Sequence, residues 1–161
     1  MQGVLGGIEI FLKHHFVDKR KVGLWGISRG AIVAASLAVT KPELFAAGIL
    51  QSGAYDIKAL LNNIQIEGIR ENYYEEAGKS DEAIKERSTI LKMEKLSCPT
   101  LILHGEKDDR YPAEQIRLLD KKLTELNKEH ETVILPDADH FITRQTRREY
   151  TLPFLKKHLQ K

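Results

Sequence analysis

Cysteine is nearly absent from this sequence. Cys98 is the only cysteine in 161 residues, so no disulfide can form within the chain. A single thiol favours a reducing compartment, and we expect a cytoplasmic protein. The sequence also lacks an apolar run near the roughly 18 residues of a membrane span, and its first residues lack the pattern of a secretion signal. We therefore expect no membrane partner.

An excess of one charge is also missing. The 25 lysines and arginines nearly balance the 23 aspartates and glutamates, which argues against a nucleic-acid partner. His14 and His15 are adjacent, but no third ligand lies at a metal-site spacing. Gly3, Gly6 and Gly7 do not form a phosphate loop, because no strand precedes them and no Gly-Lys-Ser/Thr follows. We expect no metal and no organic cofactor.

Four short apolar runs are present, and helical patterns separate them. Each run is apolar at consecutive positions, which is typical of a strand covered on both faces. Strands that alternate with helices predict an α/β fold whose mostly parallel sheet of about four strands is flanked by helices. We expect one domain over 1–161, in which the polar segment 56–95 forms a helical excursion over the sheet's edge or a cap-like segment. The runs are 22–27, 46–50, 100–103 and 132–135.

The most informative segment joins the first apolar run to a helix rich in small residues. It contains Gly26-Ile27-Ser28-Arg29-Gly30, which is Gly-x-Ser-x-Gly between a strand and a helix. In that context the turn lifts the Ser28 hydroxyl above the carboxyl end of the sheet, and Gly26 and Gly30 avoid bulk where strand and helix approach. The backbone N–H of Arg29 is expected to face an oxyanion at this site. The alternative is a tight turn with a solvated serine.

A serine nucleophile needs a general base, and the base needs a carboxylate to orient it. Asp108 follows the third apolar run and His140 follows the fourth. Both are therefore expected at the carboxyl ends of strands, on the same side of the sheet as Ser28. The chain order of serine, acid and histidine is that of the α/β-hydrolases. Asp109 is equally carboxylic, and spacing alone does not choose between it and Asp108.

Other reactive side chains are expected to be structural. Asp137 and Asp139 flank His140, but sequence neighbours rarely reach an imidazole ring from the required side. His104 ends a buried run before a glycine, where a structural histidine is expected. Cys98 precedes a proline at a strand entrance with no base nearby, so we expect core packing.

These motifs resemble, over nearly the whole chain, the catalytic domain of the prolyl oligopeptidase family of α/β-hydrolases. The resemblance assigns the acid to Asp108 rather than Asp109. The sequence departs from the family pattern at Thr89, where proline is frequent, and at Asp139, where glycine is commoner. Neither departure touches the three functional positions. The matching segments are the elbow at 26–30, the acid loop at 104–108 with Pro112, and the histidine loop at 139–141.

The resemblance implies a serine peptidase that cleaves its substrate through an acyl-enzyme. The same three groups also cleave esters, so a carboxylesterase acting on small acyl esters is an alternative. A third possibility is a catalytically poor remnant with a role in subunit association. The substrate is expected to be a small ester or a short peptide. Tyr73 and Tyr74 either line its pocket or pack the segment around them.

The chain has about twenty residues before the run at 22–27, which is enough for one helix. A complete fold of this type has several strands there, so we expect a truncated α/β-hydrolase that also lacks the family's propeller. The run at 22–27 is then an edge strand, and a homo-oligomer or a partner chain is expected to cover it. The second oxyanion donor, normally supplied by an earlier loop, is expected to come from outside this chain.

Overall fold

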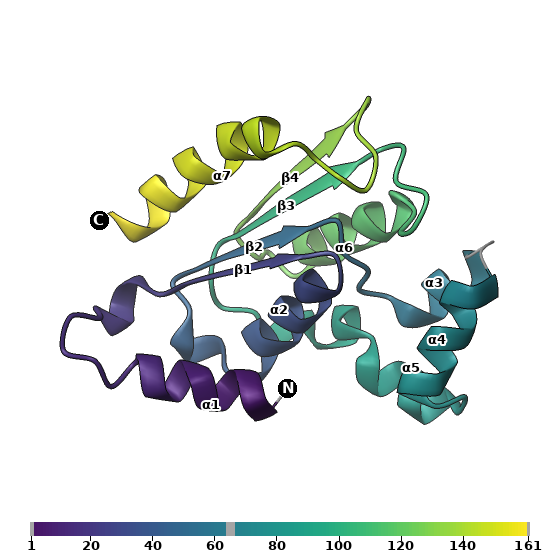
Figure 1. The fold of residues 1–161 in the computed structure, drawn as a ribbon, viewed down its shortest axis with the longest axis horizontal. Helices are drawn as coiled ribbons and strands as arrows, with labels where there is room; N and C mark the ends of the chain where they lie inside the picture. The colour runs from purple at the N-terminus through teal and green to yellow at the C-terminus, as the bar shows by residue number, and fades with distance from the viewer. Residues whose placement is uncertain (1, 64–66, 161) are drawn as a thin grey trace.

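The four predicted strands form one parallel sheet (Figure 1). The structure is a computed structural model that describes residues 2–63 and 67–160. The strands lie in the sheet in the order β1-β2-β3-β4, which is their order in the chain. Helical segments connect each strand to the next, as a parallel sheet requires. The α/β-hydrolase fold class predicted from the sequence is confirmed. The strands are β1 (Gly23–Ile27), β2 (Ala47–Gln51), β3 (Thr100–Gly105) and β4 (His130–Leu135).

Helices cover the two faces of the sheet unequally. Helices α1, α2 and α6 lie on one face, whereas α7 crosses the other (Figure 1). Among the described residues, no helix combines the length and the apolar character needed to cross a membrane. The helices are α1 (Gln2–Phe11), α2 (Arg29–Thr40), α3 (Ile57–Asn63), α4 (Glu67–Ala77), α5 (Asp81–Arg87), α6 (Glu114–Glu125) and α7 (Arg144–Leu159), with short 3-10 helices η1 (Lys19–Lys21), η2 (Pro42–Leu44) and η3 (Thr89–Lys95).

The larger core lies between the sheet and helices α2 and α6. Leu50 and Ile102 point from β2 and β3 into this core and are almost completely buried. Alanines dominate the facing side of α2, so the helix axis comes close to the sheet. On the opposite face Leu101 packs against Phe154 of α7. Each fully buried leucine or isoleucine contributes about 1.5–3 kcal/mol relative to exposure.

The strands differ in how well they are covered. All residues of β2 and β3 are buried, whereas β1 and β4 are only partly buried. Trp25 and Ile27 of β1 stay 43% and 40% exposed. Within the described ranges β1 has β2 as its sole neighbour, and α7 contacts β2 and β3 on that face. The prediction that every run is covered on both faces is therefore wrong for β1 and β4, because a run of apolar residues does not reveal its neighbours.

Helices α3 to α5 lie beyond the carboxyl ends of the strands (Figure 1). They form part of the predicted excursion 56–95, which starts shortly after β2 ends. The side chain of Gln115 anchors this start, since its Oε1 accepts hydrogen bonds from the backbone N–H groups of Tyr55 and Asp56 at 3.0 Å. A second apolar cluster joins α3, α4 and α5 to Tyr111. Helices α3 to α5 therefore lie beyond the carboxyl ends of the strands and not over the sheet's edge, whereas η3 packs in the larger core.

Candidate active site

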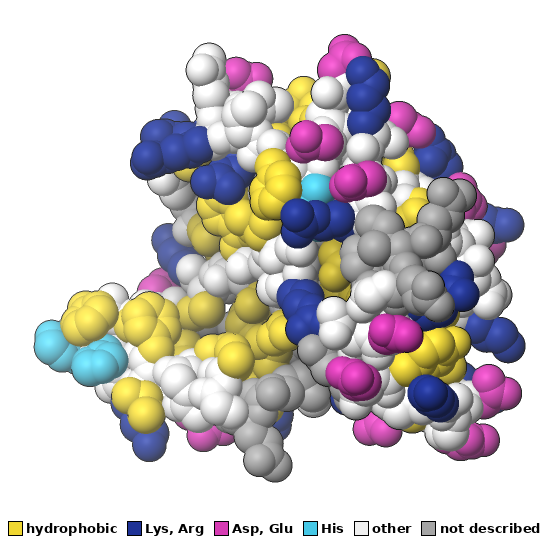
Figure 2. Space-filling view, turned by 45° about the vertical axis from the view of Figure 1, so that its right-hand side comes forward, with side chains coloured by type: hydrophobic (Ala, Val, Ile, Leu, Met, Phe, Trp, Pro, Cys, Tyr) yellow, Lys and Arg dark blue, Asp and Glu magenta, His cyan; other side chains and the backbone are white. Residues whose placement is uncertain are grey.

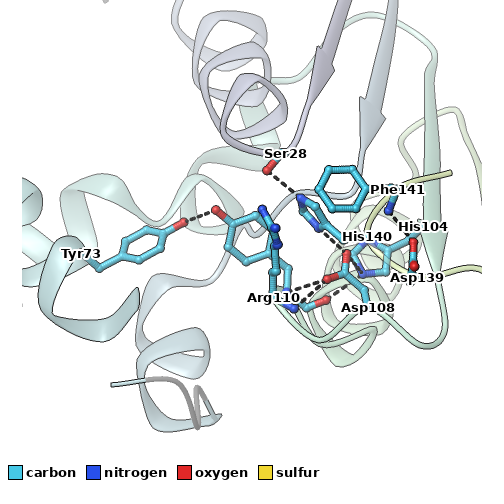
Figure 3. A network of polar contacts seen from close by, with 9 residues as sticks. Ser28, Tyr73, His104, Asp108, Arg110, Asp139, His140 and Phe141 are labelled. Atoms are coloured by element: carbon cyan, nitrogen blue, oxygen red, sulfur yellow. Dashed lines mark hydrogen bonds and ion pairs between the residues drawn. The ribbon is translucent and has the colours of Figure 1, made fainter. Parts of the chain in front are cut away.

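Ser28 occupies the junction between β1 and α2 in a conformation that few serines adopt. Its backbone has φ 57° and ψ −124°, and its N–H donates to the carbonyl of Gln51 in β2 at 2.9 Å. A serine at a helix N-terminus usually caps the helix with its hydroxyl. Here the side chain makes no capping hydrogen bond and lies instead 2.9 Å from Nε2 of His140 (Figure 3).

The two glycines of the elbow have different surroundings. A Cβ placed on Gly26 would overlap the carbonyl of Gly30 and the Cα of Ala31. The close approach of β1 and α2 therefore requires glycine at position 26. A Cβ placed on Gly30 meets no described atom within 4 Å. The prediction that position 30 must lack a side chain is therefore wrong. The atom of Gly30 that lies close to Gly26 is its backbone carbonyl, and the place where a Cβ would stand is open.

His140 links Ser28 to Asp108. The Nδ1 atom of His140 lies 2.8 Å from Oδ2 of Asp108, and both side chains are buried. An ionised carboxylate only accepts hydrogen bonds, so Nδ1 carries the proton and Nε2 of the neutral ring accepts from the Ser28 hydroxyl. The other carboxylate oxygen, Oδ1, accepts the backbone N–H groups of Arg110 and Tyr111 at 2.9 Å. Asp108 is thus held at both oxygens.

The acid loop and the histidine loop pack backbone against backbone. A Cβ on Gly105 would overlap the carbonyls of Ala138 and Asp139. The N–H of Lys107 donates to the carbonyl of Ala138 at 2.9 Å, and the N–H of Glu106 donates to that of Leu135 at the same distance. Since β3 and β4 are neighbours in the sheet, these contacts place the acid and the histidine together without help from β1.

The alternative acids lie away from the imidazole ring. Asp109 is exposed. The carboxylate of Asp137 accepts a hydrogen bond from Lys107 at 2.8 Å, which lowers the pKa of Asp137. Asp139 accepts the backbone N–H of Phe141 at 2.7 Å. The ring of His140 therefore has Asp108 as its carboxylate partner, as the family resemblance implies.

The other reactive residues take the places expected of structural side chains. His14 and His15 are exposed after α1, and His14 stacks on Phe16 with ring centroids 5.2 Å apart. Cys98 is buried, and burial raises the pKa of its thiol. The three N-terminal glycines lie inside α1. In the part of the chain that the structure describes, no group of three or more His, Cys, Asp or Glu side chains could hold a metal ion.

Tyr111, which was not among the predicted site residues, connects the helical segment 56–95 to His140. The hydroxyl of Tyr73 donates to that of Tyr111 at 3.0 Å, and the ring of Tyr111 lies edge-on to His140 with centroids 5.6 Å apart. Tyr74 instead packs in the second apolar cluster, with Lys79 5.9 Å from its ring. The available signal for Tyr111 was its position three residues after the acid.

The surroundings of His140 combine an aromatic ring with positive charge. Phe141 is 69% exposed and lies edge-on to His140 with centroids 5.2 Å apart. The guanidinium of Arg110 lies 4.8 Å from the centre of the Phe141 ring. Figure 2 shows hydrophobic side chains gathered near the middle of one face, next to side chains of both charges. Next to His140, the exposed ring of Phe141 and the charge of Arg110 therefore lie together.

Comparison with known proteins gives relatives of one kind. The model of the prolyl oligopeptidase family matches residues 1–161. The uncharacterized peptidase YuxL of Bacillus subtilis is 28% identical over 144 residues, which cover 84% of this chain and 21% of that protein. The uncharacterized peptidase YtmA of the same organism is 24% identical over 144 residues, with 87% and 55% covered.

A solved structure of an acylaminoacyl peptidase in complex with Z-Gly-Gly-Phe-chloromethyl ketone superimposes with a TM-score of 0.89. The two chains are 26% identical, and the match covers 99% of this chain and 27% of that one. The chain thus spans about a quarter of that enzyme and about a fifth of YuxL. Because the family model covers the whole sequence, this chain belongs to the prolyl oligopeptidase family.

Proposed function

We propose that this chain carries the catalytic triad of a serine hydrolase, with Ser28 as nucleophile, His140 as general base and Asp108 as the orienting acid. The hydroxyl oxygen of Ser28 attacks the substrate carbonyl carbon while its proton passes to Nε2 of His140. His140 then gives this proton to the leaving amine or alcohol, and an acyl-enzyme forms. Water, deprotonated by His140, releases the acid product and restores Ser28.

One observation carries this proposal: a continuous path of two short contacts joins the three side chains. Nε2 of His140 lies 2.9 Å from the Ser28 hydroxyl, and Nδ1 lies 2.8 Å from Asp108. These are the distances of a nucleophile with its base and of a base with its orienting carboxylate. A serine with a structural role alone would be expected to cap α2, which Ser28 does not do.

Arg29 supplies one oxyanion donor in this proposal. It is the first residue of α2 and directly follows Ser28, so its backbone N–H belongs to the positive end of the helix dipole. Negative charge that develops on the substrate oxygen is stabilised there. We propose that the second donor comes from outside the described residues, beside β1.

Peptide bonds are the proposed substrates, because the family and the named relatives are peptidases. The exposed ring of Phe141 provides apolar surface for a substrate side chain next to the histidine. Esters fit the same mechanism, since the leaving oxygen of an ester depends less on protonation by His140 than the leaving nitrogen of a peptide does. A panel of aminoacyl anilides and nitrophenyl esters distinguishes a peptidase from a carboxylesterase.

Labelling with a fluorophosphonate probe tests the triad directly. We expect the native protein to gain one covalent adduct, located at Ser28 by peptide mass mapping. Ser28→Ala should not be labelled, because the activated oxygen is gone. Ser97→Ala is the matched control: this exposed serine only donates to the carbonyl of Pro42 at 2.8 Å. Equal labelling of Ser28→Ala and the native protein would contradict the proposal.

A further inference from the structure

A second histidine lies directly behind the acid. His104, near the end of β3, has no exposed surface. Its Nε2 atom lies 2.8 Å from the carbonyl oxygen of Tyr111 and 3.4 Å from Oδ2 of Asp108. This is the carboxylate oxygen that also accepts from His140. Figure 3 shows Asp108 between the two histidine rings, with Ser28 beyond His140.

The contacts of His104 determine where its proton lies. A carbonyl oxygen only accepts hydrogen bonds, so the Nε2 atom facing Tyr111 carries the proton. Within the described ranges Nδ1 is buried without a hydrogen-bond partner. Burial is the largest influence and lowers the pKa of His104, against the opposing effects of the Tyr111 carbonyl, Asp108 and Glu106. The ring is therefore neutral near pH 7, with its N–H dipole directed at the acid loop.

We propose, on the basis of the triad proposed above, that His104 is a positioning residue for Asp108. Its N–H holds the Tyr111 carbonyl and faces Oδ2, and the backbone N–H of Tyr111 in turn binds Oδ1. His104 so fixes the carboxylate that orients His140. Because the ring is neutral, it holds Asp108 without cancelling the negative charge that stabilises protonated His140.

This role makes a prediction that simple core packing does not. Without the N–H of His104, Oδ2 of Asp108 faces one donor fewer and becomes a stronger acceptor for His140. Protonated His140 is then favoured, so the acidic limb of kcat/KM moves to higher pH, by about half a pH unit. A histidine that only fills space would change the stability or the active fraction and leave the position of this limb unchanged.

The test compares three variants across pH with a nitrophenyl ester. His104→Leu should shift the acidic limb upward and lower kcat more than it changes KM. His104→Gln should restore the native limb, since its amide N–H can reach the Tyr111 carbonyl. The control is His130→Leu: this ring also lies 2.8 Å from a carbonyl, of Lys128, and 3.3 Å from a carboxylate, of Asp120, but at the opposite end of the sheet. It should leave the profile unchanged.

An NMR titration of the His140 ring in the same variants gives a readout that needs no turnover. We expect the pKa of His140 to rise in His104→Leu and to return in His104→Gln. An unchanged His140 titration in folded His104→Leu overturns the positioning role, and so does an equal shift in His130→Leu. If the native protein shows no hydrolysis and no fluorophosphonate labelling, the triad proposal fails, and the titration still decides whether His104 acts on His140 through Asp108.

Discussion

Strands β1 and β3 have similar apolar sequences and opposite situations in the sheet. β3 has a neighbour on each side and is buried at every position, whereas β1 has only β2 among the described residues and is partly exposed. Ser28 follows β1, and Asp108 lies shortly after β3. Asp108 therefore belongs to an enclosed half of the molecule, and Ser28 belongs to an open half.

The residues of the proposed triad therefore lie in segments that are held by different numbers of contacts. Asp108 is held by two backbone N–H groups and faces two histidines. Ser28 is held by one backbone hydrogen bond to β2 and by the close packing of Gly26 against α2. Loss of a contact in the enclosed half is therefore expected to cost more stability than a similar loss in the open half. The stability of the open half is expected to depend on what lies beside β1.

The largest effect is expected at the acid. Asp108→Asn should lower kcat about 10⁴-fold, or about 5.5 kcal/mol in barrier height, because an amide N–H facing Nδ1 favours the wrong histidine tautomer. Asp109→Asn is the adjacent control and should change kcat little, since this side chain is exposed. Ester hydrolysis at saturating substrate measures both. A larger loss in Asp109→Asn would transfer the acid role to that residue.

The two strands should also differ in what truncation costs. Ile102→Ala in β3 removes a fully buried side chain and should lower the free energy of unfolding by about 2–5 kcal/mol. Ile27→Ala in β1 removes a side chain that is 40% exposed and should cost less than about 1 kcal/mol. Urea denaturation of both variants gives the values. Equal costs would mean that β1 is covered in solution.

One position of the open half is expected to be as constrained as the core. Gly26→Ala should destabilise the fold by about 1–3 kcal/mol or more, because its Cβ overlaps the backbone of α2. Gly30→Ala meets free space inside α2 and should stabilise it by up to about 1 kcal/mol. Thermal unfolding distinguishes them. A destabilised Gly30→Ala would show that neighbours outside the described residues crowd this position.

The smallest effect on the free energy of unfolding is expected at the open edge of β1. A substitution there should instead change how the protein assembles. The backbone N–H of Ser28 donates to Gln51 of β2. Backbone N–H and C=O groups alternate in direction along a strand, so those of Trp25 and Ile27 point away from β2. We expect the protein to associate along β1, and Ile27→Lys to weaken this association by placing a charge there. Sedimentation at micromolar concentration tests both. A native monomer of 18.3 kDa with full activity would exclude an essential partner at this edge.

The sequence predicted the elements of this fold better than their environment. Runs of consecutive apolar residues identified all four strands. The elbow and loop motifs named Ser28, Asp108 and His140, which the structure brings within hydrogen-bonding distance. Their catalytic roles stay predictions. The preference for Asp108 over Asp109 came from the family resemblance, because adjacent carboxylates differ only in the direction that the folded loop gives them.

The features that were not predicted all depend on contacts between distant segments. The edge position of β1 was predicted and is confirmed within the described residues. The incomplete cover of β1 and β4 on the faces of the sheet was not predicted, because it depends on which helices pack there. The place of the excursion follows from Gln115, 59 residues beyond the backbone N–H of Asp56 that it binds. The link from Tyr73 through Tyr111 to His140 likewise joins three separate segments.

The backbone conformation of Ser28 lowers the stability of the fold. A positive φ costs a side-chain-bearing residue about 1–3 kcal/mol, and glycine would adopt it freely. This loss of stability is not offset by a capping hydrogen bond, because the Ser28 hydroxyl makes none. Ser28→Gly should consequently yield an inactive protein that melts at a higher temperature. A serine that lowers stability without capping the helix is what the proposed role of Ser28 as a nucleophile predicts.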